Sequence, residues 1–149
     1  MRRITYILLC VFAVLATACD NEGMRSSVPP VYVRYSLDLV AEYPHFMPDN
    51  GFQALTFTEP RNMYDAVGYA GLLVWVSMEG KYCAADLCCP YCLDRETPVK
   101  IDGFYAVCPK CGEKYDLSYG YAFPTQGKTR EHLRLYTTFI QGTKLIIRN

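Results

Sequence analysis

The sequence has little histidine and lacks the common catalytic motifs. Only two histidines, His45 and His132, occur among its 149 residues, and neither lies in an H-E-x-x-H motif. Phosphate-binding loops and nucleophile elbows are absent as well. These absences argue against metal-dependent hydrolysis, nucleotide binding and serine-type catalysis, and we expect a protein that is not an enzyme. We expect His45 in a loop and His132 at the surface.

The chain also lacks an excess of positive charge. Lys and Arg together number 15, as do Asp and Glu. Without residues 1–18, 13 basic residues remain against 15 acidic ones, a net charge near −2 with no basic run. Binding to nucleic acid needs clustered Lys and Arg that neutralise phosphates. We therefore expect no nucleic-acid partner.

No apolar run is long enough to span a membrane, which needs about 20 residues. The run Ile4–Leu15 is shorter, and two arginines precede it, as in an export signal. It ends in Leu-Ala-Thr-Ala-Cys, with the cysteine at position 19. This ending resembles the lipobox of bacterial lipoproteins, in which the cysteine is acylated and becomes the mature N-terminus. We predict a lipoprotein signal peptide at residues 1–18 and lipidation at Cys19.

Lipidation at Cys19 would anchor the chain to a membrane, because each buried CH₂ group contributes about 0.8 kcal/mol and several acyl chains attach stably. Residues 19–30 then form the lipidated cysteine and a polar tether, and residues 31–149 form one domain. We expect a location in the cell envelope, on the periplasmic or surface side of a membrane. The membrane is one expected partner, and an envelope redox protein or another protein is a second. A generic signal peptide with an incidental cysteine is the alternative.

The domain carries the signals of short β-strands. Tyrosine and phenylalanine, which favour strands, number 13 and 7 in the chain. Val31–Leu39 alternates apolar and polar residues, as a half-buried strand does. Leu72–Val76 is continuously apolar, as expected of a strand buried on both faces. No helical stripe exceeds two turns, so the predicted class is all-β.

Two hairpins and one long loop are predicted. Asp102-Gly103 lies within Val99–Val107 and favours a two-residue type I′ turn. Leu133–Tyr136 and Lys144–Ile147 pair across a turn at Gln141-Gly142. The stretch Arg61–Gly71 is predicted to be a loop.

Six cysteines follow position 19, and four of them have the spacing of a metal site. Cys89, Cys92, Cys108 and Cys111 form the pattern C-x₂-C-x₁₅-C-x₂-C, typical of four thiolates around one ion. Each C-x₂-C pair can converge when the chain makes a tight turn, or knuckle, between its two cysteines. The predicted hairpin between the pairs brings the knuckles together, and Gly112 lets backbone amides turn toward sulfur.

The same cysteines have a second interpretation. Exported proteins fold in oxidising compartments, which favour disulfides over thiolate sites. Cys83 and Cys88 are the candidate partners of an accessory disulfide. Spacing thus favours metal, the compartment favours disulfides throughout, and both alternatives stay open.

From about Gly71 to the C-terminus, the order of features resembles a Rieske-type iron–sulfur domain. Cys89-Pro90-Tyr91 and the stretch from Cys108 to Asp116 stand where that family has its two ligand loops. Gly120, Pro124 and Gly127 lie where it has a third, proline-bearing loop. With the lipobox, the chain is similar to Rieske-like lipoproteins of bacterial envelopes. The resemblance implies small antiparallel sheets and a metal subdomain at about residues 83–127, here with two knuckles like those of rubredoxin or a zinc ribbon.

The resemblance also implies electron transfer, and a tyrosine whose hydroxyl binds a ligand sulfur, matched here by Tyr115. Rieske centres hold one iron by two cysteines and the other by two histidines. Tyr91 and Cys111 occupy the two histidine positions, and Glu113 replaces a family serine. The remaining ligand set of four cysteines suits zinc, a single iron or an all-cysteine [2Fe–2S] cluster.

Three functions are compatible with these residues. The first is a non-catalytic module held by a four-cysteine zinc site, because a closed thiolate shell leaves no open position for a substrate. The second is electron transfer through iron on the same ligands, with Tyr115 tuning the centre. The third is a metal-free interaction module held by disulfides. Tyr91 and the other tyrosines near the site either shield a redox centre, form a docking surface or, as we favour, pack in the fold.

Overall fold

The computed structural model describes residues 26–149. The predicted signal peptide, the predicted lipidation at Cys19 and most of the tether lie outside these residues. The described part is all-β, as predicted: it contains strands and one short 3₁₀ turn, Pro48–Asn50, but no α-helix. None of its segments is a helix long and apolar enough to span a bilayer.

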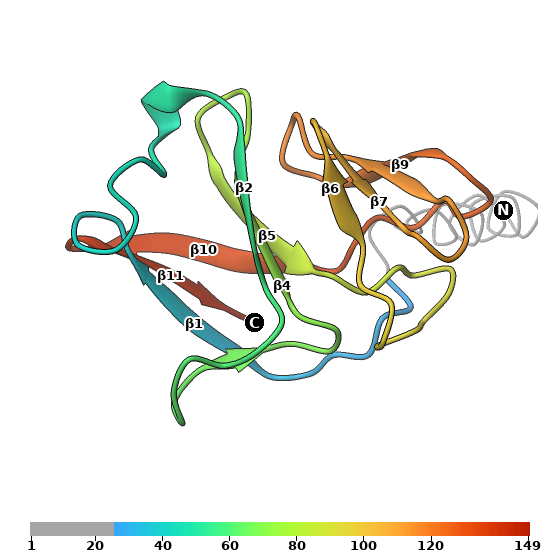
Figure 1. Ribbon diagram of the computed structural model, residues 1–149, viewed down its shortest axis with the longest axis horizontal. Coiled ribbons are helices and arrows are strands. Elements are labelled where there is room, and N and C mark those ends of the chain that lie inside the picture. Colours follow the sequence, from blue (N-terminus) through green and yellow to red (C-terminus); the bar gives the residue numbers. More distant parts are fainter. Residues whose placement is uncertain (1–25) are drawn as a thin grey trace, which may run out of the picture.

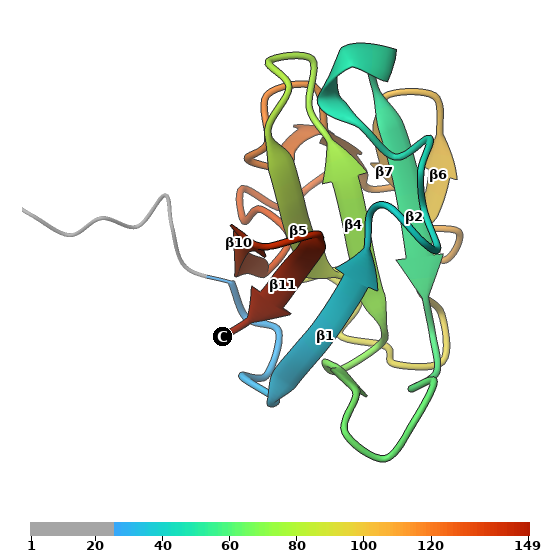
Figure 2. The same cartoon turned by 90° about the vertical axis from the view of Figure 1, so that its left-hand side faces the viewer.

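The strands form two antiparallel sheets (Figure 1). The larger sheet has seven strands in the order β2-β4-β5-β10-β11-β1-β3 and is nearly closed (Figure 2). The smaller sheet has four strands in the order β6-β7-β8-β9. The bounds are β1 Val33–Asp38, β2 Gln53–Phe57, β3 Ala66–Val67, β4 Leu72–Val76, β5 Tyr82–Asp86, β6 Lys100–Asp102, β7 Tyr105–Val107, β8 Lys114–Asp116, β9 Phe123–Gln126, β10 Leu135–Gln141 and β11 Lys144–Arg148.

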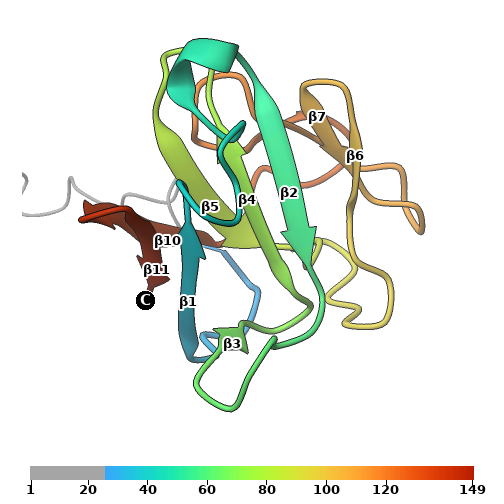
Figure 3. The same ribbon diagram turned by 60° about the vertical axis from the view of Figure 1, so that its left-hand side comes forward.

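Alternating side chains fill the inside of the larger sheet. In β1, Val33, Tyr35 and Leu37 are buried, while the residues between them are partly or fully exposed, as the alternation predicted. They pack with every second residue of β4 and with Leu145 and Ile147 of β11. β1 and β4 lie on different parts of the curled sheet (Figure 3), so its curvature is what encloses this core.

Strand β4 is buried on both faces, which confirms the prediction from its continuous apolar run. One face of β4 points into the core that the curled seven-stranded sheet encloses. The other face, with Leu73 and Trp75, packs against the cysteine-bearing part of the chain. The indole Nε1 of Trp75 donates a hydrogen bond to the carbonyl of Leu117, at 2.8 Å. This buried bond ties the two sheets together.

The predicted hairpin within Val99–Val107 is confirmed, but its turn lies one residue later. Asp102 pairs with Tyr105 in the ladder, so Gly103 and Phe104 are the two turn residues. Gly103 has φ +58°, and Phe104 has no positive φ. A positive φ only at the first turn residue is typical of type II′ and not of the predicted type I′. Gly103 therefore occupies the one turn position that requires a positive φ.

The other predictions need smaller corrections. The C-terminal hairpin is present, but β11 pairs with Thr137–Gln141 and not with Leu133–Tyr136. The reason is that β10 is long: its first two residues pair with β5 and the remainder with β11. The loop predicted at Arg61–Gly71 contains the two-residue strand β3, which pairs with β1.

Candidate metal centre

Two loops of the same backbone shape carry the four cysteines. The first, residues 89–93, follows β5, and the second, residues 108–112, follows β7. In each loop, the carbonyl of the first cysteine accepts a hydrogen bond at 2.9 Å from the amide four residues later, which belongs to Leu93 or Gly112. Both of these residues have positive φ, +50° for Leu93 and +78° for Gly112. The loops are therefore equivalent knuckles, as the spacing predicted.

The knuckles bring the four sulfurs into one cluster. The Sγ atoms of Cys89, Cys92, Cys108 and Cys111 lie within 4.8 Å of one another. Across the two loops, the sulfurs of Cys89 and Cys111 are 3.7 Å apart, and those of Cys92 and Cys108 are 3.8 Å apart. Thiolates at about 2.3 Å around a tetrahedral ion are about 3.8 Å apart. The four cysteines thus form a group that can hold a metal ion.

Backbone amides face the sulfurs of Cys89, Cys108 and Cys111. Burial raises the pKa of Cys89 to about 11, although the hydroxyl of Tyr115 and the amides of residues 91 and 92 act in the opposite direction. Burial acts on Cys108 as well, but there the amides of Cys111 and Lys110, together with the thiols of Cys111 and Cys89, outweigh it, and its pKa is lowered. Amides directed at sulfur stabilise a thiolate, which is the form that binds metal.

Tyr115, on β8, lies beside the cluster as predicted. Its side chain is fully buried, and its hydroxyl lies 3.2 Å from the Sγ of Cys89. Burial raises the pKa of Tyr115 far above its usual value, with a further contribution from Cys89. The hydroxyl therefore stays protonated and can donate to a thiolate at Cys89.

The cluster has a buried side and an exposed side. Cys89 and Cys108 are buried, whereas Cys92 is partly accessible and Cys111 is exposed. Tyr91 is 49% exposed, so its ring is not packed in the fold as we favoured; its backbone amide, however, faces Cys89. The structure thus leaves one edge of the site open to solvent.

Two buried carboxylates that the motifs did not reveal hold the site in place. Asp86, at the end of β5, is fully buried and accepts hydrogen bonds from the amides of Tyr69, Ala70 and Cys88 and from the hydroxyl of Tyr136. Its bond to Cys88, at 2.8 Å, fixes the chain where it enters the first knuckle. Asp86 could have been recognised from the sequence, because it is an acidic residue within the apolar stretch from Ala84 to Leu87.

Glu113, directly after the second knuckle, is the other buried carboxylate. It is 1% exposed and accepts hydrogen bonds from the amides of Lys128 and Thr129. Gly127 has φ +131°, and a Cβ there would also overlap the Glu113 carboxylate, so any other residue would be strained. Glu113 thus fastens the loop around Gly127 to the second knuckle.

An ion pair of 2.6 Å between Lys110 and Asp94 joins the two knuckle regions at the surface.

The structure does not contain the accessory disulfide predicted between Cys83 and Cys88. Both thiols are free, as are the four of the cluster. Cys83 lies in β5 and Cys88 lies two residues beyond its end, and the three extended steps from Cys83 to Asp86 already span about 10 Å. A disulfide needs Cα atoms within about 7 Å. The extended strand therefore keeps the two cysteines apart.

The two histidines are not part of the cluster. His45 is exposed in a loop, as expected. His132 is 7% exposed, so the expectation that it lies at the surface is wrong. Its ring packs edge-on against Phe123, with ring centroids 6.3 Å apart, and its Nδ1 contacts the carbonyl of Leu133. His132 is buried because the chain runs back toward β10 at this point. The polar residues around it gave no sign of this.

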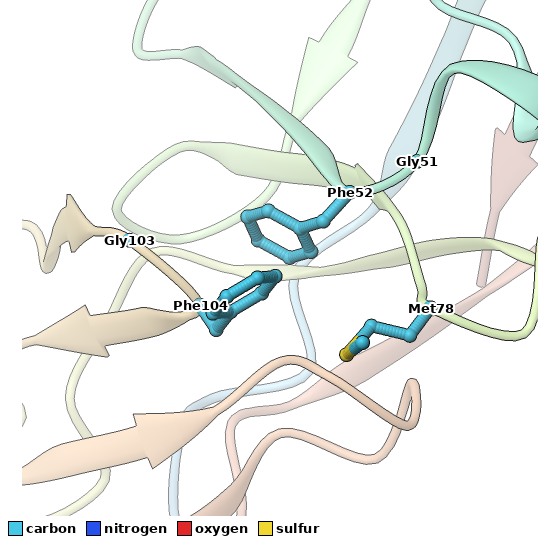
Figure 4. Close-up of a pocket in the computed structure, with 5 residues that line it drawn as sticks. All are labelled: Gly51, Phe52, Met78, Gly103 and Phe104. Atoms are coloured by element: carbon cyan, nitrogen blue, oxygen red, sulfur yellow. The ribbon is translucent and has the colours of Figure 1, made fainter.

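An apolar hollow of about 310 Å³ lies between the sheets, at the tip of the β6–β7 hairpin (Figure 4). It is lined by Phe52, Met78 and Phe104 together with two glycines. The two phenylalanine rings meet edge to face, with centroids 4.9 Å apart. No polar side chain lines the hollow, so it offers no group for chemistry, and Cys108 follows the opposite end of β7.

The two positive-φ positions give a test of the knuckles. We expect Gly112→Ala to lower the free energy of unfolding by about 1 kcal/mol, because an alanine in the left-handed region is strained. A Cβ at Gly112 meets nothing within 4 Å, so a steric clash adds no further loss. The matched control is Leu93→Ala, which should change stability less, since a side chain already occupies that conformation. Equal losses in urea unfolding would show that left-handed strain is not the cause of the loss at Gly112.

A functional assignment rests on the residues of this chain alone. No protein-family model matches the sequence, and no curated protein or solved structure matches it either. The described residues offer a group of four cysteines that can hold a metal ion.

Proposed function

We propose that this protein is a membrane-anchored metal-binding protein whose four clustered cysteines hold one tetrahedral ion in a non-catalytic site. The observation that carries the proposal is the approach of the four sulfurs to within 4.8 Å of one another. Thiolate sulfur suits zinc and iron, whereas magnesium and calcium prefer oxygen ligands. Four protein ligands complete a tetrahedral shell, so no position is open for substrate. Zinc with a structural role is our first choice of ion.

The sulfur separations favour one ion over a two-iron cluster. A [2Fe–2S] centre places two irons and two sulfides between its thiolate pairs, and it therefore needs more room than one ion. All four sulfurs lie within 4.8 Å of one another, which leaves room for a single tetrahedral ion but not for two irons and two sulfides between thiolate pairs. Of the predicted groups, zinc or a single iron fits these sulfurs better than a cluster does.

Electron transfer by a single iron is the alternative function. Two observations favour it: the bond from the Tyr115 hydroxyl to the Cys89 sulfur, and the exposure of Cys111. Hydrogen bonds to ligand sulfur tune the potential of iron–sulfur centres, and an exposed edge gives a redox partner access. The Rieske-type relation inferred from the order of the loops is part of this proposal, as is its redox partner in the envelope.

The anchoring part of the proposal rests on the lipobox that ends at Cys19. A mature chain acylated at this residue would be held on the periplasmic or surface side of an envelope membrane. Mass spectrometry of the protein recovered from membranes tests this directly. We expect a mature N-terminus at Cys19 with a mass increase from several acyl chains, and an unmodified N-terminus would contradict it.

Metal content tests the central part of the proposal. We expect about one equivalent of zinc per chain in full-length protein purified anaerobically without chelators, because four thiolates complete a zinc shell. Elemental analysis gives the amount, and visible absorption reports iron. One equivalent of iron would support electron transfer instead. Absence of metal, with the cysteines oxidised in thiol counting, would support the metal-free, disulfide-bonded module and overturn the proposal.

A further inference from the structure

The first described residues are fastened to the segment that connects β9 and β10. The amide and hydroxyl of Ser27 donate to the carboxylate of Glu131, at 2.5 and 2.8 Å. The guanidinium of Arg134 donates to the carbonyls of Ser26 and Val28, at 3.2 and 2.7 Å. The side chain of Val28 is 1% exposed and belongs to the core that also contains Cys89 and Cys108. These contacts fix the point at which the N-terminal tether meets the domain.

Two half-exposed aromatic rings lie close to this point. Tyr121 and Phe123 are 50% and 49% exposed, and their rings stack with centroids 5.5 Å apart. Phe123 also meets the ring of His132, the residue next to Glu131, which binds Ser27. In Figure 1, the chain that follows β9 passes beside the first blue residues. The aromatic pair and the tether attachment therefore belong to one side of the domain.

The same side carries positive charge. Lys128 and Arg130 lie in the loop after β9, and both are exposed. Neither forms an ion pair with any carboxylate among residues 26–149. The carboxylates of the nearby Glu113 and Glu131 accept hydrogen bonds from backbone amides and from Ser27, not from the side chains of Lys128 or Arg130. We call Tyr121, Phe123, Lys128 and Arg130 the aromatic–basic surface.

The length of the tether limits how far this surface can be from an anchor. Seven peptide steps separate Cys19 from Ser26, and an extended chain covers at most about 3.6 Å per residue. An acylated Cys19 thus keeps Ser26 within about 25 Å of the membrane. Aromatic rings are favoured at the boundary between lipid and water, and each nearby Lys or Arg gains about 1 kcal/mol from an anionic surface.

We propose that the aromatic–basic surface lies against the lipid bilayer to which the chain is anchored, with Tyr121 and Phe123 at the headgroup boundary. The inference rests on the lipid anchor of the proposed function but not on its metal. It gives the anchored domain a defined orientation, with β9 and the following loop toward the membrane.

Quenching by brominated lipid tests the orientation. The full lipidated chain carrying Phe123→Trp is placed in vesicles of phosphatidylcholine and phosphatidylglycerol, with or without bromine on the acyl chains. Bromine quenches only indoles that reach the lipid, and the native Trp75 is fully buried. We expect the emission of this variant to fall about twofold in brominated vesicles. The matched control is Tyr64→Trp, at a 71% exposed position in the loop between β2 and β3, whose emission should stay unchanged.

The outcomes separate the inference from the proposed function. If the chain floats with the vesicles but neither Phe123→Trp nor a second variant, Tyr121→Trp, is quenched, the surface does not face the bilayer and the inference is overturned. Emission that shifts with protein concentration but not with bromine would assign the surface to contacts between copies, which would overturn the inference as well. A chain that fails to float with vesicles would instead overturn the anchor itself.

Discussion

Replacement of Cys89 by serine is expected to reduce bound metal from about one equivalent to a small fraction. Cys89 is fully buried, and its sulfur touches both the Cys111 sulfur and the Tyr115 hydroxyl. A serine hydroxyl does not ionise near neutral pH and so cannot supply the thiolate that the ion needs. Structural zinc sites contribute about 10 kcal/mol or more to folding, so we also expect the melting temperature to fall by about 10 °C or more. Elemental analysis and thermal unfolding measure the two effects.

The neighbouring cysteine supplies the control for this variant. Cys88 is equally buried and adjacent in sequence, but its sulfur lies outside the cluster: it packs in the hydrophobic core and forms a hydrogen bond of 3.6 Å with the carbonyl of Cys89. Cys88→Ser should therefore retain metal, with at most a modest loss of stability. Metal retained equally by both variants would show that the four sulfurs are not the ligands.

Replacement of Asp86 by alanine is expected to lower the free energy of unfolding by about 4 kcal/mol. The change leaves three backbone amides and the Tyr136 hydroxyl without their acceptor in a fully buried region. Each unsatisfied buried group costs about 1–3 kcal/mol, and relaxation recovers part of the sum. Burial raises the pKa of Tyr136, and the charge of Asp86 raises it further, so the hydroxyl stays protonated as a donor. Urea unfolding monitored by circular dichroism measures the loss.

Two further variants provide a scale for the loss of stability expected from Asp86→Ala. Tyr136→Phe removes one of the four donors, and its cost should be about 1 kcal/mol. Asp102→Ala changes an exposed carboxylate in the β6–β7 hairpin and should alter stability by less than about 0.5 kcal/mol. If Asp86→Ala were as mild as Asp102→Ala, the buried carboxylate would not organise the entry to the first knuckle.

The cysteine site was the part of the molecule best predicted from the sequence. A C-x₂-C pair is a local feature, because five residues are enough to define a knuckle and its backbone bond. The hairpin around Asp102-Gly103 was predicted correctly, but the turn was placed one residue too early. The register of the β6–β7 ladder decides which two residues form the turn. The αL conformation of Leu93 could not be predicted, since leucine rarely adopts it and the equivalent position in the second knuckle is a glycine.

The sequence by itself determined the all-β class, the strand buried on both faces and the four clustered cysteines. Each of these follows from short-range pattern: alternation, a continuous apolar run, or paired spacing. Only the tertiary structure decided that Asp86 and Glu113 are buried, that His132 is not at the surface, and that Cys83 and Cys88 stay apart. These outcomes depend on which distant segments meet, such as β5 with Tyr136 of β10 and Glu113 with the loop at Lys128. Burial and hydrogen-bond partners are properties of the packed chain, and no single segment carries them.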